Sequence, residues 1–165
     1  MREPIRTGFP PGVPLVYVHM VEPLDEPPPR DYRVLVTGDQ NWRCRAVARE
    51  VIERLKARHG ARLVVVHGAA AGVDSTFAAA ASIAGVTQEP YPADWRTYGR
   101  SAGPRRDAAI LASGIDLCLV LHRTLNRSGE TRDCVAKCLA AGIQVWLVDS
   151  GALPVRPRRF REVWD

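Results

Sequence analysis

From residue 32 onward, short apolar runs alternate with longer segments in which apolar residues recur every three or four positions. The periodic segments predict helices over 43–59, 73–84, 104–113 and 130–141. The short runs predict strands over 33–37, 63–67, 89–91, 116–121 and 143–148. Continuously apolar strands that alternate with helices indicate a parallel sheet covered on both faces. We therefore expect an α/β fold, a Rossmann-like three-layer sandwich with a mostly parallel sheet of about five strands.

The segments on either side of this pattern differ from it in composition. Residues 1–31 form a proline-rich N-terminal extension, 32–149 the predicted domain, and 150–165 a basic C-terminal tail. A chain of 165 residues has room for one domain with a full core. Within the extension, the apolar segment 13–20 could dock as an edge strand, pack on a neighbouring subunit or remain a loosely ordered arm. Docking, whether on the sheet or on a subunit, and a loosely ordered arm are equally weighted interpretations.

Composition and charge indicate which classes of protein and partner to expect. An apolar fraction of 46% and a charged fraction of 25% are typical of soluble globular proteins. No apolar run is long enough to span a bilayer, and charges and prolines stand where a signal peptide has its apolar stretch, so we expect a cytoplasmic protein. The four cysteines lie in periodic segments, so we expect them to be reduced thiols. No further histidine or cysteine pair is spaced to complete a metal site with them. A net charge of +5 suits an anionic partner, either a nucleotide or a nucleic acid.

The first candidate ligand loop follows the first predicted strand. Ligands of open parallel sheets bind beyond the carboxyl ends of the strands. Gly38 permits a tight turn, Asp39 could cap the next helix or meet a ribose hydroxyl, and Trp42 could stack on a base or pack under the loop. For this loop alone, capping and packing are the favoured readings.

The second candidate loop, HGAAAGVD, follows the second predicted strand. The small residues from Gly68 to Gly72 leave backbone amides uncovered, as a phosphate cradle requires. Asp74 falls in the first helical turn, where a carboxylate suits the helix dipole. His67 at the strand end is a candidate ligand-binding residue, although a histidine at such a position more often has a hydrogen-bonded structural role.

The third candidate loop carries the most specific signal. Glycines and arginines surround a predicted helix start, which combines flexibility with fork-shaped donors for a phosphate. Compact domains rarely keep so long a loop without a use. Its candidate ligand-binding residues are Asp94, Trp95, Gly99, Arg100, Gly103 and Arg106.

The order of these motifs, TGD..W, HGAAAGVD and PADW..YGRSAGPRRD, resembles that of the SLOG superfamily, and more narrowly its YspA/YpsA-like branch of small bacterial and phage proteins. The superfamily also includes the Lonely Guy phosphoribohydrolases and the Rossmann-like domain of a DNA-processing protein. The resemblance covers about residues 32–149 and neither tail. It implies that Arg106 is the arginine of the family's AGPxRN motif, with Asp107 where that motif has Asn.

The resemblance also implies a fourth element, a glycine-rich turn that presents amides to a phosphate. In this chain the turn reads NRSGET, so that Ser128, Gly129 and Thr131 form a helix N-terminal anion site. Glu130 places a negative charge beside any phosphate there. Lonely Guy enzymes carry a glutamate three residues past the threonine, and this position is Cys134. A thiol cannot replace that carboxylate, which leaves Glu130 as a weak candidate for catalysis.

The sequence therefore favours a protein that binds or senses a nucleotide or an ADP-ribose-like metabolite. The first alternative is an N-glycosidic or phosphoribosyl hydrolase, and the second is a nucleic-acid-binding protein. The resemblance implies a homodimer or higher homo-oligomer, and no membrane partner is expected. No cofactor is identified, although Asp39, Asp74 and Asp94 could meet a nucleotide either directly or through Mg²⁺. We expect no dedicated metal site.

Overall fold

The computed structural model describes residues 30–122, 129–148 and 157–159. The chain divides into two units, Met1–Arg30 and Asp31–Asp165, and every helix and strand below lies in the second. The apolar segment 13–20 and Ser128 fall outside the described residues.

Six strands form a single sheet in the order β3-β2-β1-β4-β5-β6. All neighbouring pairs are parallel except β5 and β6, which are antiparallel. The predicted α/β fold with a mostly parallel sheet is confirmed, and β6 adds an antiparallel edge that the sequence did not predict. The bounds are β1 (Tyr32–Gly38), β2 (Leu63–His67), β3 (Thr87–Pro90), β4 (Leu117–Leu121), β5 (Gln144–Val148) and β6 (Pro157–Arg159).

The helices follow the predicted periodic segments, with short additions. The α-helices are α2 (Arg45–His59), α3 (Val73–Ala84), α4 (Trp95–Tyr98), α5 (Ala102–Ala112) and α6 (Gly129–Ala140). Two 3-10 turns, η1 (Gly60–Arg62) and η2 (Gly99–Ser101), follow α2 and α4. The segment predicted as the third loop therefore contains a short helix. None of the helices in the described ranges has the length and apolarity needed to cross a membrane.

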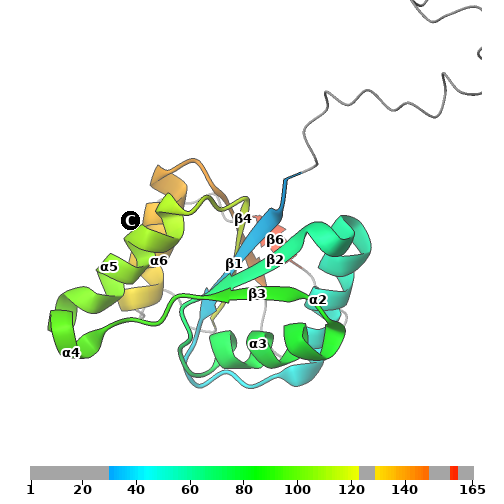
Figure 1. The fold of residues 1–165 in the computed structure, drawn as a ribbon, viewed down its shortest axis with the longest axis horizontal. Helices are drawn as coiled ribbons and strands as arrows, with labels where there is room; N and C mark the ends of the chain where they lie inside the picture. The colour runs from blue at the N-terminus through cyan, green and yellow to red at the C-terminus, as the bar shows by residue number, and fades with distance from the viewer. Residues whose placement is uncertain (1–29, 123–128, 149–156, 160–165) are drawn as a thin grey trace, which may run out of the picture. The chain divides into compact units, whose positions relative to one another are not determined.

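Alternation of side chains along the strands produces two hydrophobic cores. Val34 and Val36 of β1 face one core with Phe77 of α3, whereas Leu35 faces the other core with Ile110 of α5. Figure 1 shows α2 and α3 on one side of the sheet and α5 and α6 on the other. This arrangement explains why the strands are apolar on both faces.

The strand order reverses between β1 and β4. The chain leaves β1 for the β2 side of the sheet and leaves β4 for the β5 side, so the two connections diverge. In open α/β sheets such a switch point forms a crevice at the carboxyl ends of the strands, where ligands bind. Gly38 and Leu121 are paired across this end of the sheet.

Candidate functional site

Gly38 lets the first loop approach β4 closely at the switch point. A Cβ at this position would lie 2.0 Å from the Leu121 carbonyl oxygen, a contact that no side chain tolerates. The next amide, Asp39 N–H, donates to the same oxygen at 3.0 Å. Gly38 is therefore required by the packing of backbone on backbone, whatever the ligand.

Gly72 joins the second loop to the first. It has a φ of +82°, and a Cβ there would lie 2.2 Å from the Asp39 carbonyl oxygen. Val73 N–H donates to that oxygen at 3.2 Å. The Asp39 carboxylate accepts from Asn41 N–H at 2.8 Å, which closes a local turn. The two loops thus form one interlocked unit beyond the strand ends.

The amides of the second loop already have partners within the chain. Asp74 Oδ2 accepts from Gly68 N–H at 2.9 Å and from Ala70 N–H at 3.2 Å. Ala69 N–H donates to His67 Nδ1 at 3.0 Å. Burial raises the pKa of Asp74 above its ordinary value. In this conformation Asp74 occupies the place that we predicted for a phosphate, so the amides from Gly68 to Ala70 are not free to bind one.

His67 has a structural role at the end of β2. Because its Nδ1 accepts a hydrogen bond, the ring proton of the neutral form lies on Nε2, which donates to Gln88 Oε1 at 3.0 Å. The side chain is buried, with 4% of the residue exposed. Both ring nitrogens are therefore engaged, and His67 holds the second loop rather than presenting a group to a ligand.

Arg106 crosses from α5 to the second loop. Its Nη1 donates to the Gly68 carbonyl oxygen at 3.3 Å, and its Nε donates to Asp107 Oδ1 at 3.1 Å. A Cβ on Gly68 would lie 2.7 Å from Nη1, so the glycine makes room for the guanidinium. Burial raises the pKa of Asp107, and the adjacent Arg106 opposes this shift. The predicted residues Gly68 and Arg106 are thus in direct contact.

A small hollow lies where these groups meet. Its volume is about 40 Å³. This is enough for a water molecule or two and far too little for a whole nucleotide. We call it the switch-point hollow; its lining residues are Thr37, Gly38, Gln40, Ala70, Asp74, Arg106, Asp107, Glu130, Thr131 and Cys134.

The hollow brings together part of the predicted site. Gly38, Asp74, Arg106, Glu130 and Thr131 were predicted from the sequence and line it. The remaining predicted residues that the structure describes surround the hollow or lie outside it. Those not among its lining residues are Asp39, Trp42, His67, Gly68, Gly72, Asp94, Trp95, Gly99, Arg100, Gly103 and Gly129.

The charges around the hollow set its chemistry. Asp74, Asp107 and Glu130 supply carboxylates, whereas Arg106 is the cation among the lining residues. Carboxylates accept hydrogen bonds from sugar hydroxyls, and a guanidinium binds a phosphate through paired donors. Thr131 Oγ1 donates to the Gly38 carbonyl oxygen at 3.5 Å, which places the first turn of α6 beside β1. The start of a helix attracts an anion through its dipole.

Cys134 lines the same hollow as a protonated thiol. Its hydrogen bond with the Cys138 thiol and its burial raise the pKa of Cys134 far above its ordinary value. A thiol in that state is neither a nucleophile nor a base. The four cysteines are free, and Cys118, Cys134 and Cys138 are buried. The position of the Lonely Guy glutamate therefore carries a packing residue in this chain.

Of the two roles that the sequence left open for Trp42, stacking on a base and packing under the loop, the structure shows packing. The residue is only 4% exposed and belongs to the core between the sheet and α2 and α3. Its ring stacks on Phe77, with centroids 5.9 Å apart. Its Nε1 is buried without a hydrogen-bond partner among the described residues. Trp42 packs under the loop and does not offer a ring face to a base.

Trp95 and Arg106 meet at Gly103. The vacant Cβ position of Gly103 lies 3.5 Å from Trp95 Cη2 and 4.0 Å from Arg106 Nη2. Trp95 is 51% exposed, and Asp94 caps α4 by accepting from Thr97 N–H at 3.0 Å. Hydrogen bonds from the Thr97 side chain and from Thr97 N–H lower the pKa of Asp94. One atom of the exposed Trp95 ring and one of the Arg106 guanidinium thus lie close to Gly103, which is itself buried.

No metal site is found in the part of the chain that the structure describes. Within those ranges, no group of three or more histidines, cysteines or carboxylates could hold an ion. Asp39, Asp74 and Asp94 each accept hydrogen bonds in a different loop. The alternative in which these aspartates jointly hold a cation is therefore not supported.

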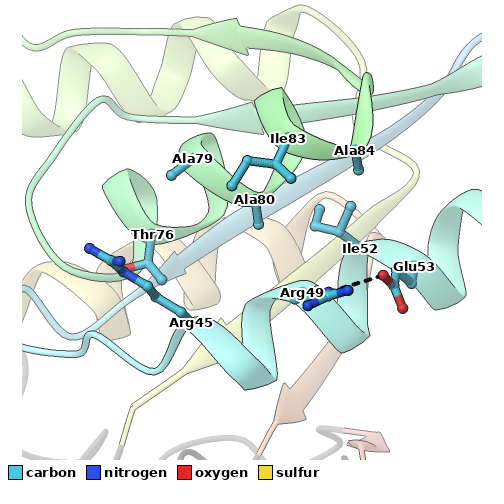
Figure 2. A pocket seen from close by; sticks show the side chains of 9 residues that line it. All are labelled: Arg45, Arg49, Ile52, Glu53, Thr76, Ala79, Ala80, Ile83 and Ala84. Atoms are coloured by element: carbon cyan, nitrogen blue, oxygen red, sulfur yellow. Dashed lines mark hydrogen bonds and ion pairs between the residues drawn. The ribbon is translucent and has the colours of Figure 1, made fainter.

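A larger groove lies between α2 and α3. Its volume is about 710 Å³, and its lining includes Ile52, Ala80 and Ile83. Figure 2 shows this groove and the ion pair between Arg49 and Glu53 along α2, with an Nε to Oε1 distance of 3.2 Å. None of the predicted ligand-binding residues lines it.

Comparison with known proteins supports both the fold and the family. Gene 61 protein of Mycobacterium phage D29 is 35% identical over 118 residues, which cover 68% of this chain and 93% of that protein. The X-ray structure of DNA processing protein A (DprA) from Streptococcus pneumoniae has the same fold, with a TM-score of 0.59 at 17% identity over 75% of this chain. The chain spans about half (52%) of that structure. The profile of the YspA, cpYpsA-related SLOG family matches residues 32–98, and the chain belongs to this family.

Proposed function

We propose that the chain binds or senses a nucleotide-type phosphorylated ligand, a nucleotide or an ADP-ribose-like molecule, at the switch-point hollow. The observation that carries the proposal is the Arg106 guanidinium in the lining of the hollow with the exposed Trp95 ring nearby: each has an atom within 4.0 Å of where a Cβ on Gly103 would lie. A stacking surface next to a phosphate-binding group is what one nucleotide requires.

The phosphate would bind at Arg106 and the start of α6. Arg106 uses Nε and Nη1 within the chain, and Nη2 is the nitrogen nearest the Gly103 position. The first residues of α6, Gly129 and Glu130, lie at the positive end of the helix dipole. This site replaces the amide cradle of the second loop, which Asp74 fills.

The hydroxyl groups of the sugar would meet the carboxylates of the hollow. Asp107 and Glu130 lie among its lining residues, and both accept hydrogen bonds when ionised. Because the hollow holds only about 40 Å³, most of the ligand would lie outside it, over α4. The base would then stack on Trp95.

Binding without turnover is the favoured form of the proposal. A hydrolase needs an ionised carboxylate beside the anomeric carbon, and Cys134 stands where the related enzymes carry it. The protonated Cys134 thiol cannot take the role of that ionised carboxylate. Release of a free base from AMP or ADP-ribose, lost on Glu130→Gln with binding retained, would instead support a hydrolase.

The test uses calorimetric titration with ADP-ribose, AMP and ribose 5-phosphate. Arg106→Gln should weaken binding about 10- to 100-fold, the effect of losing one charge-assisted contact. Arg106→Lys should give an intermediate loss, because it keeps the charge but not the planar fork. The control is Arg49→Gln, which removes an exposed arginine of α2. Equal affinities for Arg106→Gln and Arg49→Gln, with thermal melts showing both folded, would refute the proposed site.

The proposal extends to assembly and location. We expect a homodimer or higher homo-oligomer in the cytoplasm, on the basis of the family and of four free cysteines. Light scattering coupled to gel filtration measures the oligomeric state. A strictly monomeric protein at all concentrations tested would contradict that part of the proposal.

A further inference from the structure

We propose that the exposed face of α4, η2 and the start of α5 binds single-stranded nucleic acid. We call this face the aromatic–arginine surface and define it by Trp95, Arg96, Tyr98, Arg100 and Arg105, all of which are exposed. It goes beyond the proposed function, which concerns one nucleotide-type ligand at the neighbouring hollow.

Exposed aromatic rings are the first observation. Among the described residues, the exposed large hydrophobic side chains are Ile83, Trp95 and Tyr98. Two of these three are on α4, a helix of four residues. Trp95 is 51% exposed and Tyr98 is 44% exposed, so neither ring is used fully in the core. The Arg105 guanidinium covers one face of the Tyr98 ring, and the exposed parts of both rings can receive planar groups from outside the protein.

Arginines are the second observation. The Arg105 guanidinium carbon lies 4.3 Å from the centroid of the Tyr98 ring, and Arg105 Nε donates to Ser101 Oγ at 3.3 Å. Arg105 is thereby held beside the ring. The guanidinium groups of Arg96 and Arg100 have no hydrogen-bond or ion-pair partner within the described ranges. Three exposed arginines and two exposed aromatic rings thus lie within eleven residues of the chain.

This combination matches a single strand better than other polyanions. Single-stranded nucleic acid binds where aromatic rings stack on bases and arginines neutralise the backbone. A duplex hides its base faces and could use only the arginines. Asp94, which immediately precedes the surface in the chain, is occupied as the cap of α4. A helix of four residues is also too short to lie in a membrane interface as an amphipathic helix.

The surface is continuous with the proposed nucleotide site. Trp95 contributes to both, because it and Arg106 both approach Gly103. Tyr98 and Arg105 do not line the hollow. A strand could therefore place one nucleotide at Arg106 and the next over Tyr98. Substitutions at Tyr98 and Arg105 test the surface without altering the hollow.

The test measures fluorescence anisotropy of a 5′-labelled oligothymidylate about twelve nucleotides long. Tyr98→Ala should weaken binding about 5- to 150-fold, the range observed for loss of one base–aromatic stack. Tyr98→Phe keeps the ring and should bind as the unaltered protein does. Arg49→Gln on α2 is the control for loss of a positive charge elsewhere.

Salt dependence tests the arginines separately. Three phosphate contacts with a single strand predict that affinity falls about 20-fold between 50 and 200 mM salt, from a slope of roughly −0.7 per contact. Arg105→Gln should reduce this fall to about 7-fold. Arg49→Gln should leave it unchanged.

Three results would overturn the inference: no binding of the oligonucleotide, equal affinities for Tyr98→Ala and Tyr98→Phe, or binding only to vesicles of phosphatidylserine and phosphatidylcholine. ADP-ribose titration separates this inference from the proposed function. Tyr98→Ala should retain ADP-ribose binding, whereas Arg106→Gln should lose it. Oligonucleotide binding that depends on Tyr98, in a protein that binds no ADP-ribose, would support the surface and refute the nucleotide site.

Discussion

Replacing Gly72 by alanine should destabilise the protein strongly, because two separate penalties act at this position. The backbone has φ +82° and ψ −119°, a conformation that costs a residue with a side chain about 1–3 kcal/mol. The new Cβ would also lie 2.2 Å from the Asp39 carbonyl oxygen and 2.4 Å from the Gln40 carbonyl carbon. These neighbours are backbone atoms, so relief requires a loop to move, at a further cost of about 1–3 kcal/mol.

Gly60 offers a matched control for this experiment. It has φ +59° and ψ −139°, close to the conformation of Gly72, and a Cβ there meets nothing within 4 Å. Gly60→Ala should therefore pay the backbone cost alone. Urea unfolding of both variants should show Gly72→Ala less stable than Gly60→Ala by about 1–3 kcal/mol. Equal free energies of unfolding would refute the close contact between the two loops.

Two further predictions concern buried and paired carboxylates. Hydrogen bonds from Arg33 and the Tyr91 hydroxyl lower the pKa of Glu89 from its ordinary 4.5 to about 2. The stabilisation that the Glu89 carboxylate provides is therefore present above pH 4.5 and is lost as the pH falls towards 2. Glu89→Gln should remove this part of the pH dependence of the free energy of unfolding, which urea unfolding at several pH values measures. Asp74→Ala leaves the Gly68 and Ala70 amides without their acceptor and should cost about 1–3 kcal/mol for each buried donor, whereas Asp74→Asn keeps an acceptor oxygen and should cost less. Equal losses for the two Asp74 variants in thermal unfolding would contradict the role assigned to that carboxylate.

The sequence predicted the regular elements well wherever apolar patterning is strong. The strand over 63–67 and the helix over 73–84 match β2 and α3 at both ends. Gly85 ends α3 in a left-handed conformation, a stop signal that is local and therefore readable from the sequence.

Elements without such patterning were missed. Residues 157–159 are proline and arginine, which favour no strand, and they form β6 because β5 offers an edge to pair with. Residues 95–98 are too few to show helical periodicity, although Asp94 is a standard capping residue. Both elements depend on context that a local pattern does not contain.

The sequence predicted which loops meet at the switch point but not how their groups are paired. Motif order identified the loops that meet at the switch point, and Arg106 lies there as expected. The sequence could not show that Asp74 turns back to take the amides of Gly68 and Ala70. It also could not show that Trp42 belongs to the core, because an aromatic residue after a strand suits either stacking or packing.

The most direct test of the proposed site is an NMR titration with ADP-ribose that follows backbone amide and indole shifts. The account predicts that the largest changes occur at the start of α6, at Arg106 and at the Trp95 indole, around the switch-point hollow. The competing location is the larger groove between α2 and α3 (Figure 2). Shifts concentrated at Thr76, Ala80 and Ile83, or no shifts at millimolar ADP-ribose, would contradict the account.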